Sequence, residues 1–340
     1  MTKVKFYISD YHACGHVRAE VPARVINSQL SNMCIDVKNS IVMSDFPKTN
    51  LMVFQRMHRE DVYLKMMQAK ENRIKTIYEL DDDILNTPEE FAKAYKFYSD
   101  PKVRLRIVDF LSNCDAVTVS TPALASSLEA IIPAQTRYIV PNYLDLTEWD
   151  DVYRRKLEMD SGKIMIGWMA SGSHVLDIPE VRDALEVIME DHPNVYLHFI
   201  GWIGFDNMGL DKYKDRIIVE SWAPIHQLPA TMGDFDINLC PLIDNKFNRS
   251  KSNLKYLQGS ALGIPTICSP TVYEECVEDG VDGFIAKDPA SWLACLKELV
   301  ENTDLRKDMG TKARRKVADQ YDIRNNYLKW ANVFEKVIGG

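Results

Sequence analysis

The feature that most constrains the fold of this chain is a regular alternation of short apolar runs with amphipathic stretches. Each apolar run has the length of a buried strand, and the stretch after it has the spacing of apolar residues typical of a helix. In the first half the apolar runs lie at 3–8, 33–37, 50–56, 75–83, 115–121 and 137–145, and the helical stretches at 21–30, 61–73, 104–114 and 122–131. Strands that alternate with helices predict a parallel sheet with helices on both faces.

The alternation stops at a polar, charged stretch, 146–162, and then starts again. Strands are expected at 163–171, 194–201, 216–222, 235–242 and 265–270, and helices at 177–191, 251–263 and 289–302. Because 340 residues exceed what one hydrophobic core usually serves, the restart predicts a second domain. The sequence therefore predicts an α/β fold with two doubly wound, Rossmann-like parallel-sheet domains that face each other across a cleft. We expect a first domain at 1–150, a second at 163–320, and a C-terminal helix at 321–340 that crosses back to the first domain.

The composition excludes some classes of protein. A formal net charge of −8 argues against a nonspecific binder of nucleic acid or of an anionic membrane. The seven cysteines are scattered and never form Cys-x-x-Cys, so we expect reduced thiols rather than disulfides or a zinc site. The chain enters a strand-like run at once, without a signal-peptide core, and no apolar stretch reaches the ~20 residues of a membrane span. We therefore expect a soluble, cytoplasmic protein without a transmembrane segment.

Three polar segments follow predicted strands, where doubly wound sheets bind their ligands. The first is 9–22, which contains Gly15, His16 and Arg18, and the second is 169–178. The third, 244–263, is the most informative, because basic and small polar residues lie at the start of its helix: Arg249, Ser250, Lys251, Ser252, Asn253 and Lys255. Basic residues there oppose the helix dipole, and an anion on the free backbone N–H groups would remove the conflict. A diphosphate fits this requirement; the alternative is a solvated basic turn.

A resemblance to a known family enters at these residues. The block FNRSKSNLKYLQGSALGIPTICSP (247–270), followed by VEDGVDGFIAKDPASWLACLKELVEN and ADQYD, resembles the C-terminal domain of retaining glycosyltransferases with the GT-B fold. The most similar group includes sucrose- and glycogen-synthase-like enzymes. Upstream, YELDDDI, CDAVTVSTPALA, YIVPNYLD and IGWMASGSHVLD resemble the corresponding segments of shorter bacterial and phage members. The ordered set, which spans nearly the whole chain, is more specific than any single motif.

The resemblance implies a GT-B glycosyltransferase that moves a hexosyl or pentosyl group from a nucleotide-diphosphate sugar to an acceptor hydroxyl. Retention of configuration is implied, with no metal and no other cofactor, and a UDP-sugar is favoured as co-substrate. In the family, two glutamates separated by seven residues handle the donor sugar and the ribose. Their positions fall on Ser250 and Gln258, so both carboxylates are absent, although glutamine can still bond a ribose hydroxyl.

Other site residues follow from the same resemblance. The loop with Ser171, Gly172 and His174 stands where the family usually has an arginine and a lysine, and Trp222 and Ala223 end a strand where the family lodges the base. The leaving diphosphate gains negative charge, which preorganised cations and N–H groups stabilise. The predicted catalytic residues are Lys251, Lys255, His16 and Asp82. The predicted donor-binding residues are Gly15, Arg18, Ser171, Gly172, His174, Trp222, Ala223, Ser250, Ser252, Asn253 and Gln258. The predicted acceptor-side residues are Arg56, His58, Asp81 and Asp83.

Several alternatives stay open at this point. Asp81 and Asp83 match Asp-x-Asp, the metal signature of the other major glycosyltransferase fold, although acceptor recognition or local helix capping is preferred to a metal. A dehydrogenase is excluded, since no strand is followed by Gly-x-Gly-x-x-Gly. A catalytically inactive nucleotide-sugar-binding module and a sugar-nucleotide epimerase remain.

The acceptor also stays open: a glycan, a lipid, a protein or a hydroxymethylated DNA base would fit, the last as in phage DNA modification in the host cytoplasm. A basic rim for DNA would be Lys102, Arg104 and Arg106, or Arg154, Arg155 and Lys156.

Overall fold

The computed structural model describes residues 1–158, 162–201, 208–222 and 224–340. The chain divides into two compact units, and each is built from separate stretches of sequence. Unit 1 comprises Met1–Leu144, Arg249–Ser252 and Ile323–Gly340, and unit 2 comprises Asp145–Asn248 and Asn253–Asp322. The chain therefore leaves unit 1 and returns to it twice.

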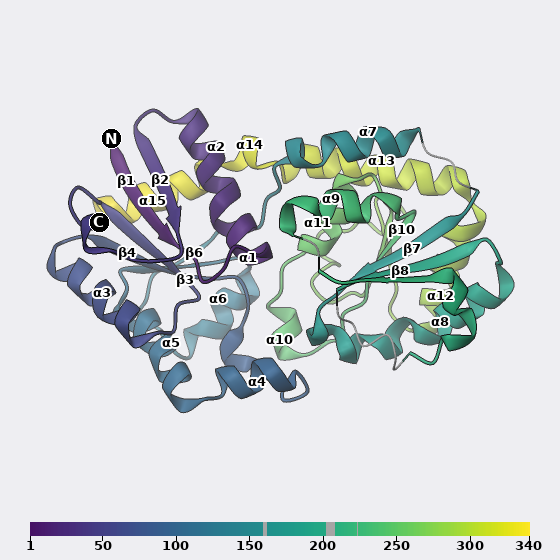
Figure 1. The fold of residues 1–340 in the computed structure, drawn as a ribbon, viewed down its shortest axis with the longest axis horizontal. Coiled ribbons are helices and arrows are strands. Elements are labelled where there is room, and N and C mark those ends of the chain that lie inside the picture. Colours follow the sequence, from purple (N-terminus) through teal and green to yellow (C-terminus); the bar gives the residue numbers. More distant parts are fainter. Residues whose placement is uncertain (159–161, 202–207, 223) are drawn as a thin grey trace. The chain divides into compact units, whose positions relative to one another are not determined.

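Unit 1 is built on a six-stranded parallel sheet with the strand order β2-β1-β3-β4-β5-β6 (Figure 1). The strands are β1 (Thr2–Tyr7), β2 (Met33–Lys38), β3 (Leu51–Gln55), β4 (Lys75–Leu80), β5 (Ala116–Val119) and β6 (Arg137–Ile139). Val4 pairs with Ile35 on one side and with Leu51 on the other, which fixes the register at the centre. The order of the strands reverses between β1 and β3, and ligands of such sheets bind at this kind of switch point.

Helices connect these strands. They are α1 (Ala13–Gly15), the π-helical turn η1 (His16–Glu20), α2 (Val21–Gln29), α3 (Glu60–Glu71), α4 (Ala92–Tyr98), α5 (Pro101–Asn113) and α6 (Pro122–Glu129), with 3₁₀ turns η2 (Met43–Asp45) and η3 (Ile84–Asn86). Two helix starts are explained by their sequence. Pro follows the N-cap in both α5 and α6, where the missing N–H costs nothing, and the side chains of Asp100 and Thr121 accept backbone N–H groups of the first turn.

The C-terminal segment completes the core of unit 1. After α14 (Ile323–Asn326), α15 (Leu328–Gly339) lies against the sheet (Figure 1). The buried Trp330 ring packs edge-on against Phe6 at 6.1 Å, and the guanidinium of Arg18 lies 4.8 Å from the same ring. The first and last segments of the chain thus share one hydrophobic core.

Unit 2 has a second six-stranded parallel sheet, with the order β12-β11-β10-β7-β8-β9 and a switch point between β7 and β10. The strands are β7 (Ile164–Met169), β8 (Val195–Ile200), β9 (Ile217–Glu220), β10 (Ile237–Cys240), β11 (Thr266–Cys268) and β12 (Phe284–Ile285). The helices are α7 (Asp150–Leu157), α8 (Ile178–Asp191), α9 (Leu228–Thr231), α10 (Lys246–Arg249), α11 (Leu254–Ala261), α12 (Pro289–Glu301) and α13 (Thr303–Gln320). The 3₁₀ turns are η4 (Leu146–Glu148), η5 (Gly172–Asp177), η7 (Asp211–Arg216), η8 (Ile225–Gln227) and η9 (Met232–Asp234).

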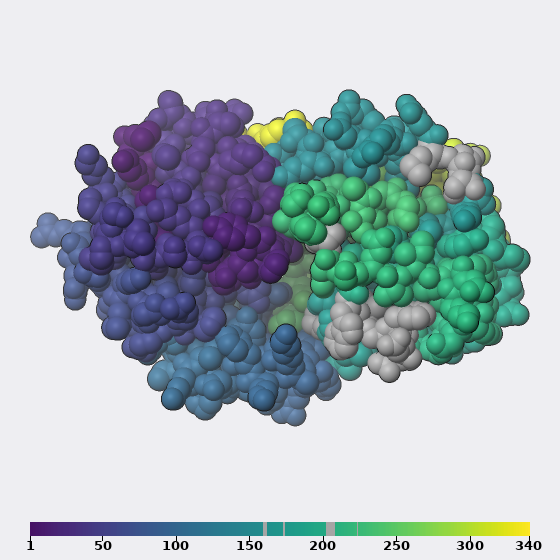
Figure 2. Space-filling view, viewed as in Figure 1, coloured from purple at the N-terminus to yellow at the C-terminus, as the bar shows by residue number. Residues whose placement is uncertain are grey.

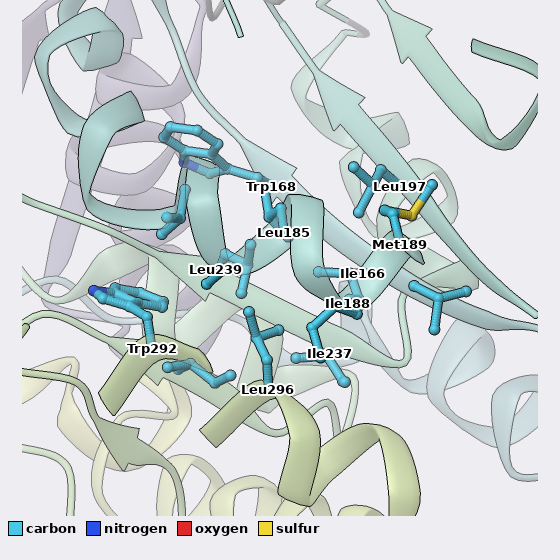
Figure 3. Close-up of a cluster of buried hydrophobic side chains, with 14 of the residues drawn as sticks. Ile166, Trp168, Leu185, Ile188, Met189, Leu197, Ile237, Leu239, Trp292 and Leu296 are labelled. Atoms are coloured by element: carbon cyan, nitrogen blue, oxygen red, sulfur yellow. The ribbon is translucent and has the colours of Figure 1, made fainter. Parts of the chain in front are cut away.

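The core of unit 2 fills the space between its sheet and the helices α8 and α12 (Figure 3). Trp168 on β7 and Trp292 on α12 are fully buried, as is Leu185 on α8. Each unit therefore has a hydrophobic core of its own.

The predicted α/β fold with two doubly wound parallel sheets is confirmed. Some elements differ from the sequence expectations. The segment 9–22, expected as a polar loop, is helical from Ala13 onward, and the polar stretch 146–162 contains α7. Like α4, α7 has no buried residue and lies on the surface (Figure 2). Short surface helices of this kind have too few apolar residues for a sequence pattern to detect.

Candidate functional site

The polar side chains in unit 2 that were expected from the sequence meet at the switch point between β7 and β10. Lys255, on the first turn of α11, donates from Nζ to the carbonyl oxygen of Met169, the last residue of β7, at 2.7 Å. The same Nζ lies 3.0 Å from Nε2 of His174 in η5. The structure thus holds a lysine ammonium at the carboxyl edge of the sheet, where doubly wound folds bind ligands.

His174 is held in turn by Asp177, which the sequence analysis did not single out. Nδ1 of His174 lies 2.6 Å from Oδ2 of Asp177, and Oδ1 of Asp177 accepts the backbone N–H of Ile243 at 2.8 Å. Both His174 and Asp177 are buried, with 4% and 1% of their surface exposed. We call these three residues, Asp177, His174 and Lys255, the switch-point relay. The signal in the sequence was the spacing of three between His174 and Asp177, which places two side chains on one side of a helical turn.

The remaining donor-side predictions surround α11 and η5. Ser171 precedes Gly172 at the start of η5, and the carbonyl oxygen of Ser171 accepts the N–H of His174 at 3.0 Å. Asn253 is the N-cap of α11, but its side chain makes no cap hydrogen bond. Gln258 is buried in α11, and its Oε1 has no hydrogen-bond partner among the described residues. A buried amide oxygen without a partner is costly, and a ligand hydroxyl could satisfy it.

Trp222 lies against Gly201, the residue after β8. A Cβ on Gly201 would come within 2.8 Å of the Trp222 ring and 2.5 Å of the carbonyl oxygen of Ala170. Gly201 also has φ +94°, a conformation that L side chains rarely adopt. Trp222 is half exposed, so one face of a large ring is available at the same edge of the sheet. Ala223 lies outside the described residues.

The segment Arg249–Ser252 belongs to unit 1 and is fixed there by three contacts, so we call it the anchored segment. The Thr121 hydroxyl donates to the carbonyl oxygen of Ser250 at 2.9 Å, and Nδ2 of Asn142 donates to Oγ of Ser252 at 2.8 Å. Nζ of Lys251 lies 3.8 Å from Oδ1 of Asp82. The two lysines that the sequence assigned to one diphosphate therefore belong to different units, Lys251 to unit 1 and Lys255 to unit 2.

Asp82 lies in a turn with several charges. Burial alone would raise the pKa of Asp82, but the positive charges of Lys251 and Arg56 outweigh it and hold the pKa below its usual value. Nη1 of Arg56 lies 3.4 Å from Oδ1 of Asp81 and donates to Sγ of Cys14 at 3.2 Å. Arg56 has φ +51°, a left-handed conformation that costs free energy in an arginine. Such strain is common at ligand sites, and this residue directly follows β3 at the switch point of unit 1.

Three of the residues predicted from the segment 9–22 have local structural partners. Arg18 is buried; its Nε donates to Glu79 at 2.8 Å, and its Nη1 donates to Oδ1 of Asn142 at 3.0 Å. Burial raises the pKa of Glu79 to about 7 against the opposing charge of Arg18. Gly15 makes a tight turn, since a Cβ there would lie 2.1 Å from the carbonyl oxygen of Asp10, and His16 places Nδ1 at 3.1 Å from Glu20. Arg18 is thus linked to the anchored segment through Asn142.

The remaining acceptor-side predictions, His58 and Asp83, contact different residues. Nδ1 of His58 is 3.4 Å from the carbonyl oxygen of Arg56, and the His58 ring packs edge-on against Phe97 on α4. Asp83 is turned inward, where Nδ2 of Asn86 and Oγ of Ser127 donate to its carboxylate. Within the described ranges, no group of three or more His, Cys, Asp or Glu side chains is placed to hold a metal ion. The same residues include no helix with the length and hydrophobicity needed to cross a bilayer.

Part of the chain matches a known protein family. Residues 181–332 match a family described as glycosyl transferase-like. Spore coat protein SA of Bacillus subtilis (strain 168) is 23% identical over 180 residues, which cover 48% of this chain and 45% of that protein. The chain thus aligns with less than half the length of this curated relative.

Solved structures resemble the chain over most or all of its length. Sucrose-phosphate synthase from Thermosynechococcus elongatus superposes with a TM-score of 0.68 at 11% identity and full coverage of both chains. HepE of Anabaena, in complex with UDP and glucose, also gives 0.68, at 13% identity, with 99% of this chain and 100% of that one covered. TarM of S. aureus gives 0.60 at 13% identity over 84% of this chain and 55% of its own. Likeness at this level of identity reports a shared fold, and it confirms the fold expected from the resemblance.

Proposed function

We propose that this chain is a glycosyltransferase of the GT-B fold, as the partial family match and the shared fold support, and that it transfers a sugar from a UDP-sugar to an acceptor hydroxyl with retention of configuration. The observation that carries the proposal is the ammonium of Lys255, fixed at the β7/β10 switch point by Met169 and His174. A nucleoside diphosphate gains negative charge as its bond to the sugar breaks, and a cation held in place beforehand stabilises that charge. The amino end of α11, which includes Lys255, adds free backbone N–H groups, whose partial charge is also positive.

UDP is the proposed nucleotide because the donor-side residues suit its parts. The half-exposed ring of Trp222 offers a stacking face for a base, and stacking of this kind stabilises a bound base by about 1–3 kcal/mol. The buried Oε1 of Gln258 is an acceptor suited to a ribose hydroxyl. HepE, which shares the fold, was crystallised with UDP and with UDP-glucose.

Unit 1 supplies the groups proposed for the acceptor. Because its pKa is lowered, Asp82 is ionised at neutral pH, and a carboxylate can orient an acceptor hydroxyl by accepting its hydrogen bond. Lys251 lies beside Asp82, and its positive charge contributes to the lowered pKa of that carboxylate. With serine at position 250, where the family has a glutamate, no side chain is assigned as a covalent nucleophile. Lys255 and the N–H groups of α11 take the place of a metal in this proposal.

The test begins with the nucleotide. Calorimetry should detect binding of UDP in preference to GDP and ADP, and UDP-sugars should yield free UDP, slowly with water and faster with an acceptor. Lys255→Met, which keeps the aliphatic stem, should weaken UDP binding about tenfold or more, since a charge-assisted contact is lost. Lys251→Met is the matched control: it should lower turnover and leave the affinity for free UDP nearly unchanged.

The two lysine variants also separate the outcomes. Unchanged UDP affinity in Lys255→Met would contradict the proposed donor site. Tight UDP binding without UDP release from any sugar nucleotide would instead identify an inactive binding module, and conversion of the donor sugar without an acceptor would identify an epimerase. Acceptor classes, namely glycans, lipids, proteins and hydroxymethylated DNA, should be compared only with the donor that releases UDP.

A further inference from the structure

We infer that Asp177 and His174 are positioning residues that fix the protonation and direction of the switch-point relay, so that UDP binding depends on the tautomer of His174. The inference rests on the proposed function, in which Lys255 binds the diphosphate. Neither Asp177 nor His174 has to touch the nucleotide for this role. Each acts through Lys255.

The tautomer follows from the donors and acceptors at the relay. A lysine ammonium has three N–H donors and no acceptor, so its 3.0 Å contact with Nε2 of His174 requires a lone pair on Nε2. The imidazole is then neutral, with its proton on Nδ1, and Nδ1–H donates to Oδ2 of Asp177 at 2.6 Å. A histidine tautomer is set by the hydrogen bond that its other nitrogen makes. Asp177 therefore determines that Nε2 faces Lys255 as an acceptor.

Asp177 is itself fixed by the backbone. Its second oxygen accepts the N–H of Ile243, in the segment that follows β10, and the carboxylate is almost completely buried. Lys255 bonds in turn to Met169 at the end of β7. The relay thus links the ends of the two strands that flank the switch point and holds the ammonium between them while His174 is neutral.

The arrangement makes nucleotide binding sensitive to acid. Among the residues that the structure describes, the charged groups in contact with His174 include Lys255 from α11 and Asp177 from η5, and a backbone N–H from the segment after β10 satisfies the far oxygen of Asp177. When His174 takes up a second proton, Nε2–H points at the ammonium, and two like charges lie in contact. Lys255 must then move away, so the affinity for UDP should fall as the solution is acidified.

The first experiment compares matched amide substitutions by calorimetry with UDP. In Asp177→Asn the amide oxygen can still accept from Ile243, but the amide nitrogen faces Nδ1 of His174 and forces the other tautomer. Nε2–H then faces Lys255, and UDP affinity should fall about tenfold, close to the loss in Lys255→Met. Asp234→Asn is the control, because both oxygens of Asp234 lie 3.0 Å from Nδ1 of the buried His198, another aspartate–histidine pair elsewhere in unit 2. It should leave UDP affinity unchanged.

The second experiment replaces the histidine. His174→Gln places an amide near Nε2 that can accept from Lys255, whereas His174→Asn reaches only toward Asp177. UDP affinity should be largely retained in His174→Gln and lost in His174→Asn, and the acid-side loss attributed to the histidine should be absent from His174→Gln. Since UDP itself titrates near pH 6, the Gln variant also corrects for the ligand. The ¹⁵N resonances of His174 should report a proton on Nδ1 in the native protein and on Nε2 in Asp177→Asn.

The proposed function and the positioning role of Asp177 and His174 predict different results for the variants. If Lys255→Met weakens UDP binding while Asp177→Asn binds UDP as the native protein does, the positioning role is wrong and the proposed function stands. If Lys255→Met binds UDP normally, the proposed function itself fails. Should Asp177→Asn not fold, the pH profiles of His174→Gln and the native protein decide: identical profiles would overturn the inference.

Discussion

Among single residues, Gly201 combines an unusual backbone conformation with close contact to an aromatic ring. Its φ of +94° is one that other residues adopt only with strain, and its missing side chain leaves room for Trp222 and for the carbonyl of Ala170. The Trp222 ring, which we propose stacks on the base, can therefore lie in this position because residue 201 has no Cβ. A substitution of Gly201 therefore tests the position of the Trp222 ring without changing any charge.

We predict that Gly201→Ala destabilises unit 2 and weakens UDP binding together. The control is Gly280→Ala in the same unit: Gly280 also has positive φ (+76°), but a Cβ there meets nothing within 4 Å. Conformational strain of about 1–2 kcal/mol is common to both, so Gly201→Ala should cost clearly more in chemical denaturation. Equal losses of stability, or native UDP affinity in Gly201→Ala, would contradict this account of Trp222.

The anchored segment is a short element held in place by side chains of unit 1. Asn142 uses both ends of its amide: Oδ1 accepts from the buried Arg18, and Nδ2 donates to Ser252. Lys251 lies between the two fixed serines, beside Asp82. Its position therefore depends on contacts at Thr121 and Asn142, neither of which carries a charge.

Ser252→Ala should separate turnover from nucleotide binding. The alanine lacks the hydroxyl that accepts from Nδ2 of Asn142, and loss of one such hydrogen bond is worth about 0.5–1.5 kcal/mol. We expect kcat to fall several-fold while the affinity for free UDP stays native. Asn142→Ala should lower kcat at least as much, because it also loses the contact with Arg18, and the double variant should lose no more than Asn142→Ala. Additive losses would mean that the two residues act separately.

The elements of the fold were largely predictable, because each buried strand is a continuous apolar run bounded by turns. The run at 50–56 became β3, in which every residue is buried, and 122–131 became α6, with its predicted start at Pro122. The long α13 was not predicted, since most of its residues are polar or charged and it follows α12 after a single residue. Such a helix is defined by its tertiary contacts.

The candidate site was less predictable, since its geometry depends on where the chain changes units. Lys251 and Lys255 are four positions apart in sequence, yet the chain crosses from unit 1 to unit 2 between residues 252 and 253. No local pattern reports that crossing. Asp177 was missed for a related reason: it resembles an ordinary helix-start residue until the structure brings Ile243 to its other oxygen.

Taken as a whole, the molecule has two hydrophobic cores and one tryptophan on a late helix in each. Trp330 on α15 belongs to the core of unit 1, and Trp292 on α12 to that of unit 2. Truncation of a buried tryptophan to alanine costs about 3–5 kcal/mol. The two residues are therefore matched probes of the two cores.

Calorimetry should show which unit each core supports and which unit binds the nucleotide. Trp330→Ala should lower the unfolding temperature of unit 1, and Trp292→Ala that of unit 2. UDP at about a hundred times its dissociation constant should add ~2.7 kcal/mol to the unit that binds it, which we expect to be unit 2. If UDP instead stabilises unit 1, which is the unit that Trp330→Ala weakens, the nucleotide binds to unit 1 and the proposed donor site in unit 2 is wrong.

The fourfold passage of the chain between the units has a consequence for biosynthesis. Residues 1–144 leave the ribosome before residues 323–340, which carry Trp330 and cover Phe6. Unit 1 therefore stays incomplete, with apolar surface uncovered, while all of unit 2 is translated. We expect the ribosome-bound intermediate to recruit chaperones until residues 323–340 emerge and complete the core of unit 1.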